Sequence, residues 1–122
     1  MSLDVYLNSS TTIKSECEYC GSEYEKIKEF YHANITHNLG TMAEAAGIYK
    51  HLWRPEELEI TTAKELIAPL TEGLKKLKGN PDFFKQYNAS NGWGVYEHFV
   101  PFVEDYLNAC IEFPDAIIEI SR

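Results

Sequence analysis

Three stretches of the chain alternate hydrophobic and polar positions, one near each end and one in between. In residues 3–7, leucine and valine alternate with polar or aromatic neighbours. Successive side chains of a strand point to opposite faces, so this period of two predicts a half-buried β-strand. The alternation recurs over residues 29–37 and 116–121, and we expect the last strand to pair with the first.

The segment between the first two strands has no single period. Residues 8–12 are polar and predict a loop, and residues 17–21 predict a turn. Residues 22–29 are rich in glutamate and lysine, and they fit either a helix or a strand.

Hydrophobic residues spaced three and four apart predict helices in the middle of the chain. A helix is expected over residues 39–46, with Asn38 as its N-cap and Gly47 as its C-terminal stop. Residues 48–53 add one or two helical turns. Pro55 ends this segment soon afterwards, because the residue before a proline disfavours the helical conformation.

Longer amphipathic helices are predicted in the second half. Thr62 and Glu65 have the spacing of a capping box, in which each side chain satisfies a free backbone N–H. The apolar stripe that follows consists of Leu66, Ile67, Leu70, Leu74 and Leu77. Pro69 lies inside this stripe and is expected to kink or split the helix. A short helix over residues 81–87 and a final helix over residues 94–112 complete the pattern.

These elements define the α+β class, with a small antiparallel sheet packed against four or five helices. A chain of 122 residues is expected to form a single domain over 1–122, and its 44% hydrophobic and 13% aromatic content is typical of a packed core. The net charge of −8 disfavours a nucleic-acid partner, since phosphate binding needs clustered lysine and arginine. It favours a basic protein or a cationic ligand.

The compartment is inferred from the first residues and from the cysteines. The segment from Met1 to Leu7 has neither a basic stretch nor a long apolar stretch, so we expect no leader peptide. No run approaches the roughly 20 apolar residues of a membrane span, and we expect a cytoplasmic protein without a membrane partner. Three cysteines cannot all pair within one chain, and Cys110 is expected to be a small buried hydrophobic residue.

Cys17 and Cys20 form the one motif whose residue types and spacing suggest chemistry. With His32 and His37 they give the pattern Cys-x2-Cys-x11-His-x4-His, one residue short of the usual spacing of a structural zinc site. The two histidines would point to opposite faces of an unbroken strand. The alternatives are a β-bulge, one histidine with a fourth ligand elsewhere, or a pair of metal-free thiols. Acidic residues after Cys20 disfavour the thiolate that redox catalysis needs.

A second cluster lies at the end of the predicted middle strand, where Asn34, Thr36, His37 and Asn38 come close together. A histidine with neighbouring amides and a hydroxyl can orient a ligand or transfer a proton. The alternative is that these groups cap the next helix and satisfy buried backbone groups.

A third candidate is Trp93, which two glycines enclose in the run Asn91–Gly94 and which can therefore stand on a sharp turn. The indole could line a pocket with Trp53, Arg54 and His98. The alternative is that it fills the core at the start of the last helix.

Three runs of residues resemble a family of small uncharacterised proteins from bacteria and their phages. The runs are Asn-Ile-Thr-His-Asn-Leu from Asn34, Leu-Trp-Arg-Pro-Glu-Glu-Leu from Leu52 and Asn-Gly-Trp-Gly from Asn91. The resemblance covers most of the chain. It implies the same small cytosolic fold and brings no established activity, ligand or cofactor.

The sequence contains no phosphate loop, no nucleophile elbow and no zinc-protease motif. We therefore expect a binding or interaction module, phage-related and holding a structural zinc, with a protein or a small molecule as its partner. The alternative is a small-molecule binder or an enzyme whose pocket contains His37, Asn34, Trp53, Arg54 and Trp93. A third hypothesis is an inhibitor of a basic host factor, which requires acidic residues gathered on one face.

Overall fold

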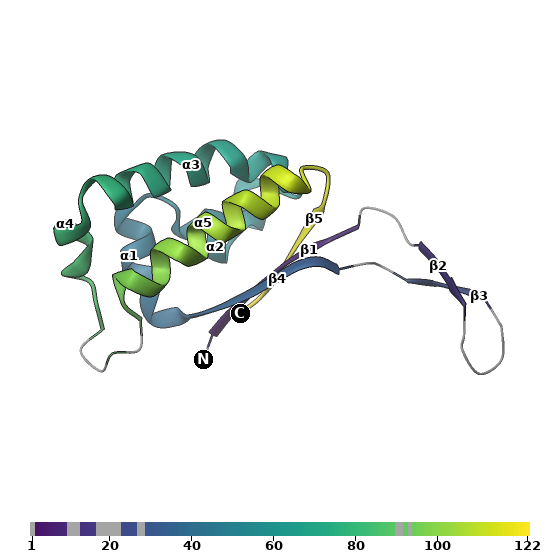
Figure 1. The fold of residues 1–122 in the computed structure, drawn as a ribbon, viewed down its shortest axis with the longest axis horizontal. Helices are drawn as coiled ribbons and strands as arrows, with labels where there is room; N and C mark the ends of the chain where they lie inside the picture. Colours follow the sequence, from purple (N-terminus) through teal and green to yellow (C-terminus); the bar gives the residue numbers. More distant parts are fainter. Residues whose placement is uncertain (1, 10–12, 17–22, 27–28, 90–91, 93) are drawn as a thin grey trace.

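The computed structural model describes residues 2–9, 13–16, 23–26, 29–89, 92 and 94–122. At its centre is an antiparallel sheet of β1 (Ser2–Asn8), β4 (Glu29–Thr36) and β5 (Ile117–Ser121), in the order β4-β1-β5. Helices cover one face of this sheet (Figure 1). The predicted α+β class and the predicted pairing of the last strand with the first are both confirmed.

A separate hairpin lies between β1 and β4 in the chain. β2 (Ile13–Glu16) pairs antiparallel with β3 (Glu23–Lys26). Figure 1 shows this two-stranded ribbon beyond the end of the three-stranded sheet and away from the helices. Within the ambiguous segment 22–29, residues 23–26 are therefore a strand.

β1 is the central strand, and its alternation decides which face of the sheet is covered. The side chains of Leu3, Val5 and Leu7 are fully buried, whereas Asp4 and Tyr6 belong to the opposite, open face. A shift of one residue would turn the apolar side chains to water. The pattern therefore fixes the register of β1 as well as its buried face.

β4 is irregular near its start, and this irregularity improves its contact with the helices. The register with β1 shifts there and leaves Phe30 as the extra residue of a β-bulge. The bulge lets two consecutive side chains face the helix layer. Tyr31 stacks on Tyr106 with ring centroids 5.9 Å apart, and Phe30 stacks on Phe113 at 4.8 Å.

The helical segments lie between β4 and β5 in the chain. They are η1 (His37–Leu39), α1 (Gly40–Ala45), α2 (Tyr49–Trp53), η2 (Pro55–Leu58), α3 (Lys64–Gly79), α4 (Pro81–Lys85) and α5 (Tyr96–Glu112). The long helices α3 and α5 pack against each other, and α5 also contacts β4. The helices that the sequence predicts are all present. Among the described residues, no helix has both the length and the apolar character needed to cross a membrane.

The start of α1 corrects one prediction. Asn38 is not an N-cap, because the chain turns earlier into η1. Thr36 caps that segment by accepting a hydrogen bond from the Asn38 backbone N–H at 3.4 Å. β4 ends at Thr36, so its hydroxyl is the first that can reach a free N–H of the following turn. Gly47 ends α1 as predicted, with a φ of +80° that suits glycine.

The N-terminal half of α3 excludes one of the two alternatives for Pro69 and corrects the predicted capping box. Pro69 does not split the helix, which is continuous. Leu66 and Leu70 are fully buried on either side of the proline, and their burial outweighs the one hydrogen bond that the proline removes. Thr62 donates to the Glu65 carboxylate at 2.9 Å, so this pair bonds side chain to side chain and does not form the predicted capping box.

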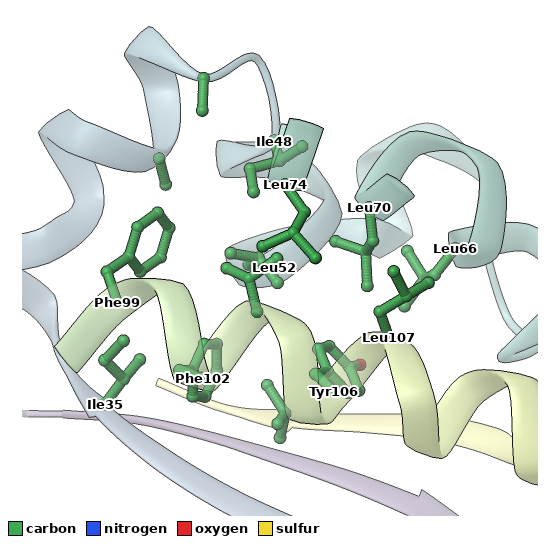
Figure 2. Packing of buried hydrophobic residues seen from close by; sticks show 14 of the residues in the cluster. Ile35, Ile48, Leu52, Leu66, Leu70, Leu74, Phe99, Phe102, Tyr106 and Leu107 are labelled. Carbon is green, nitrogen blue, oxygen red and sulfur yellow. The ribbon is translucent and has the colours of Figure 1, made fainter. Parts of the chain in front are cut away.

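The core lies between α3, α5 and the sheet. Figure 2 shows Leu66 and Leu70 of α3 opposite Phe102, Tyr106 and Leu107 of α5. Cys110 also belongs to this core and is fully buried, as predicted. Burial raises the pKa of its thiol to about 12, so the thiol stays protonated at neutral pH.

Tyr106 is the largest fully buried side chain, and its hydroxyl has no hydrogen-bond partner within the described part of the chain. Burial raises the pKa of this hydroxyl well above its usual value. An unpaired buried hydroxyl loses its bonds to water without replacing them, which costs stability.

Tyr106→Phe should therefore leave stability unchanged or raise it by about 1 kcal/mol, because the ring is kept and the unpaired hydroxyl is removed. Denaturant unfolding measures this free energy. Tyr31→Phe is the matched control, since Tyr31 stacks on Tyr106 but is only partly buried, and its effect should be smaller. A clear loss of stability in Tyr106→Phe would mean that the hydroxyl contributes a bond.

Candidate functional site

The end of β4 opens onto a groove of about 1060 Å³. Its walls come from the last residues of β4, from η1, from the loop before α5 and from the first turns of α5. Its polar lining includes Asn34, Thr36, His37, Asn38 and His98. The polar residues that the sequence places at the strand end therefore border one groove, together with a histidine from α5.

Gly94 brings the loop before α5 against the strand end. Its φ of +113° is a conformation that side-chain-bearing residues rarely adopt. A Cβ at this position would lie 2.9 Å from the Asn38 Cβ and 3.2 Å from the Thr36 methyl carbon. The Ala89 N–H donates to the Gly94 carbonyl at 3.0 Å and closes the loop at its base.

Asp4 connects two polar residues of β4 on the open face of the sheet. Its Oδ1 accepts hydrogen bonds from His32 Nε2 at 3.0 Å and from Asn34 Nδ2 at 2.9 Å. These bonds, the one from His32 first, lower the pKa of the Asp4 carboxyl. Among the described residues, Asn34 bonds through its amide nitrogen, and its side-chain oxygen is a further acceptor at the groove.

A second cavity of about 500 Å³ shares His37 with the groove. Its other lining residues include Thr41, Glu44, Tyr49, Trp53, Arg54 and Arg122. Tyr49 stacks on Trp53 with ring centroids 5.3 Å apart. Trp53 itself is buried, so the cavity has an aromatic wall beneath a charged rim.

One hydrogen bond fixes the chemistry of His37. The indole N–H of Trp53 donates to His37 Nδ1 at 2.8 Å. An indole nitrogen can only donate, so Nδ1 is the unprotonated nitrogen and neutral His37 carries its proton on Nε2. His37 is therefore a hydrogen-bond donor to any ligand that reaches Nε2. Protonation of Nδ1 would break the bond to Trp53.

The sequence suggests a single pocket, but the structure places its described residues around two cavities. Asn34 borders the groove, Trp53 and Arg54 border the second cavity, and His37 borders both. The expected role of Trp93 falls outside the described residues.

Arg122 and Tyr49 are among the residues of the second cavity that sequence reasoning missed. Arg122 arrives from the far end of the chain through β5, and nothing in its neighbourhood in the sequence signals that contact. Tyr49 lies four residues before Trp53 on α2, a spacing that places both on one helix face and that could have found it.

The predicted zinc site is described only in part. Cys17 and Cys20 lie outside the described residues. His32 bonds Asp4 on the open face, whereas His37 bonds Trp53 of α2. Where the chain is described, no group of three or more His, Cys, Asp or Glu side chains is placed to hold a metal. Zinc binding stays a prediction.

Comparisons with protein families, with curated proteins and with solved structures find no match to this chain. The resemblance carried by the three runs of residues therefore stays an expectation, and function has to be argued from the two cavities.

Gly94→Ala should destabilise the fold by about 2 kcal/mol, because it adds backbone strain and a clash with the end of β4. Gly92→Ala is the matched control. Its φ is +78°, and a Cβ there would meet nothing within 4 Å, so strain alone remains. Denaturant unfolding of both variants compares the two losses. Equal losses would contradict a tight contact between the loop and the strand end.

The predicted zinc site can be tested separately, by zinc content and thermal stability. A neutral histidine that binds metal through Nε2 carries its proton on Nδ1, so zinc on His37 would exclude the Trp53 bond. Purified, untagged protein should contain one equivalent of zinc. Chelation should lower the melting temperature, and Cys17→Ser should abolish the zinc. A shift of the Trp53 indole N–H resonance on chelation would identify His37 as a ligand. A metal-free protein with an unchanged melt would leave the cysteines as free thiols.

Proposed function

We propose that this protein is a cytoplasmic, non-catalytic binding module that holds an extended segment of a partner protein in the groove at the end of β4. The observation that carries the proposal is the position of β4. It is an edge strand of the described sheet, and its last residues line the groove. An edge strand offers backbone N–H and C=O groups with which a partner strand can pair.

The shape and lining of the groove favour a peptide over a compact ligand. Ile35, Leu39 and Phe102 are buried and form an apolar floor, while Asn34 and His98 are exposed at its rim. Its volume of about 1060 Å³ lies just above the roughly 300–1,000 Å³ of small-molecule pockets. An apolar floor with polar rims beside a strand edge suits alternating side chains of an extended chain.

Negative charge near the start of β4 indicates which kind of partner segment the protein favours. Glu29 begins β4, and burial together with the nearby Asp105 carboxylate raises the pKa of Tyr31 on this strand to about 12. Asp105 of α5 therefore lies near Tyr31, close to the start of β4. With a net charge of −8, the protein favours a segment that carries lysine or arginine at this end.

The bonds of the two histidines support binding over catalysis. In the described part of the chain, His32 bonds a carboxylate and His37 bonds an indole, and neither of these bonds is to a hydroxyl or a thiol. A general base needs hydrogen-bond reach to the group that it activates.

Selection from a library of short random peptides, followed by amide NMR titration with one selected synthetic peptide, tests this function. Selected peptides should carry basic residues at one end and should shift the resonances of residues 33–38 and 94–98. Asp105→Asn should weaken binding about threefold, because one exposed charge contributes up to about 1 kcal/mol.

Asp115→Asn is the matched control, since Asp115 is exposed and pairs with Lys64 away from the groove. It should leave affinity unchanged. Acidic peptides, or shifts confined to other surfaces, would contradict the proposal. A response to small aromatic compounds but to no peptide would favour the small-molecule alternative.

A further inference from the structure

We propose that the second cavity, beside α2, binds an oxyanion, meaning a carboxylate or a phosphate group, through Arg54 and Arg122. This inference goes beyond the peptide groove and does not depend on it. Both arginines border the cavity of about 500 Å³, and Glu44 is the single acidic side chain among the described residues that line it. The planar fork of N–H donors on arginine matches the oxygens of carboxylates and phosphates.

The two arginines come from distant parts of the chain and are placed by the fold. Arg54 follows α2 directly, and Arg122 follows β5. Arg122 Nη1 donates to the Trp53 carbonyl at 2.7 Å and to the Glu56 carboxylate at 2.7 Å. The bond to the carbonyl ties Arg122 to the end of α2 and so to the residue beside Arg54.

Both guanidinium groups keep donors for a ligand. A guanidinium has five N–H donors. Within the described part of the chain, the hydrogen bonds of Arg122 start from Nη1 alone. Arg54 bonds Tyr49, and its Nη1 makes a long contact of 3.4 Å with Glu57. Exposed pairs of this kind contribute little to stability, so an incoming oxyanion can replace these carboxylates at small cost.

Neutral donors accompany the two charges. The hydroxyl groups of Thr41 and Tyr49 border the cavity, and hydrogen bonding with Tyr49 raises the pKa of Arg54. His37 also borders it, and Trp53 holds His37 in the tautomer with its proton on Nε2. The lining thus combines charged N–H donors with hydroxyl donors, the combination that oxyanions require.

Acidic side chains around the arginines lower the affinity of the cavity for an anion. Glu44, Glu56 and Glu57 stand near the arginines, and the whole chain has a net charge of −8. Their repulsion limits affinity for a free anion. Because the groups at the rim are exposed, binding should weaken as ionic strength rises.

Amide NMR titration of the full chain with inorganic phosphate, and separately with acetate, tests the proposal at low ionic strength against matched chloride. We expect saturable shifts of Thr41, Tyr49 and the Trp53 indole N–H. Arg54→Gln and Arg122→Gln should each weaken binding at least about tenfold, the loss expected for one charge-assisted hydrogen bond.

Lys50→Gln is the matched control. It removes one positive charge from the same cluster, since Lys50 pairs with Glu57 at 3.6 Å, but Lys50 does not line the cavity. Affinity should change less than about twofold, as for an exposed charge. Saturation by phosphate alone or by acetate alone would support the proposal and identify the group that the site accepts.

Several results would overturn the proposal. They are shifts that do not saturate with either anion, shifts confined to other surfaces, and equal weakening by Lys50→Gln and Arg54→Gln. Melting curves of all variants separate lost binding from lost folding. If Arg122→Gln does not fold, Arg54→Gln decides alone, because Arg54 is partly exposed and contacts Glu57 only weakly.

Discussion

The burial of one face of β1 is the constraint on which the rest of the structure depends. Leu3, Val5 and Leu7 are fully buried, and β1 pairs with β4 on one side and with β5 on the other. Its register therefore sets where both neighbours end. Thr36 of β4 lies opposite Ser2, which places the groove at that end of the sheet. The pairing with β5 likewise carries the chain to Arg122 and the second cavity.

Features that repeat along the chain could be predicted from the sequence, because a hydrophobic period reports directly on a buried face. The three strands of the sheet and the helices follow from such periods. The hairpin of β2 and β3 could not be found this way, since residues 22–29 are almost uniformly polar. The bulge at Phe30 depends on which residue lies across the sheet, and the cap at Thr36 depends on where the strand ends. The hydrophobic periodicity of the sequence carries no information on either.

The candidate sites also contain residues that the sequence predicts, because they are neighbours in the chain, and residues that only the fold brings in. Asn34, Thr36 and His37 are neighbours in the chain, so their gathering at a strand end could be predicted. Arg122 lies opposite α2 only because β5 returns beside β1, a contact between residues far apart in sequence. Such a contact depends on topology, and the sequence around Arg122 carries no signal for it.

The hydrogen bond from Trp53 to His37 joins two of the runs on which the resemblance rests, those that begin at Asn34 and Leu52. Gly94, from the third run, packs on the residue that follows His37. The run that begins at Asn34 thus contacts residues of both other runs. Because the His37 imidazole accepts from the indole through Nδ1, its neutral form donates through Nε2. Burial of Trp53 holds this arrangement without any contribution from a ligand.

The charges at the two proposed sites favour ligand groups of opposite sign. The start of β4, with Glu29 and Asp105 near it, attracts basic groups, whereas Arg54 and Arg122 attract an oxyanion. Fields from the whole surface govern how often a ligand approaches, and short-range donors govern how long it stays. A free, multiply charged anion is repelled by the net charge, which lowers its affinity for the arginines. A carboxylate or phosphate attached to a neutral or basic carrier is not, so the charge distribution selects for ligands whose anionic group is carried by a larger molecule.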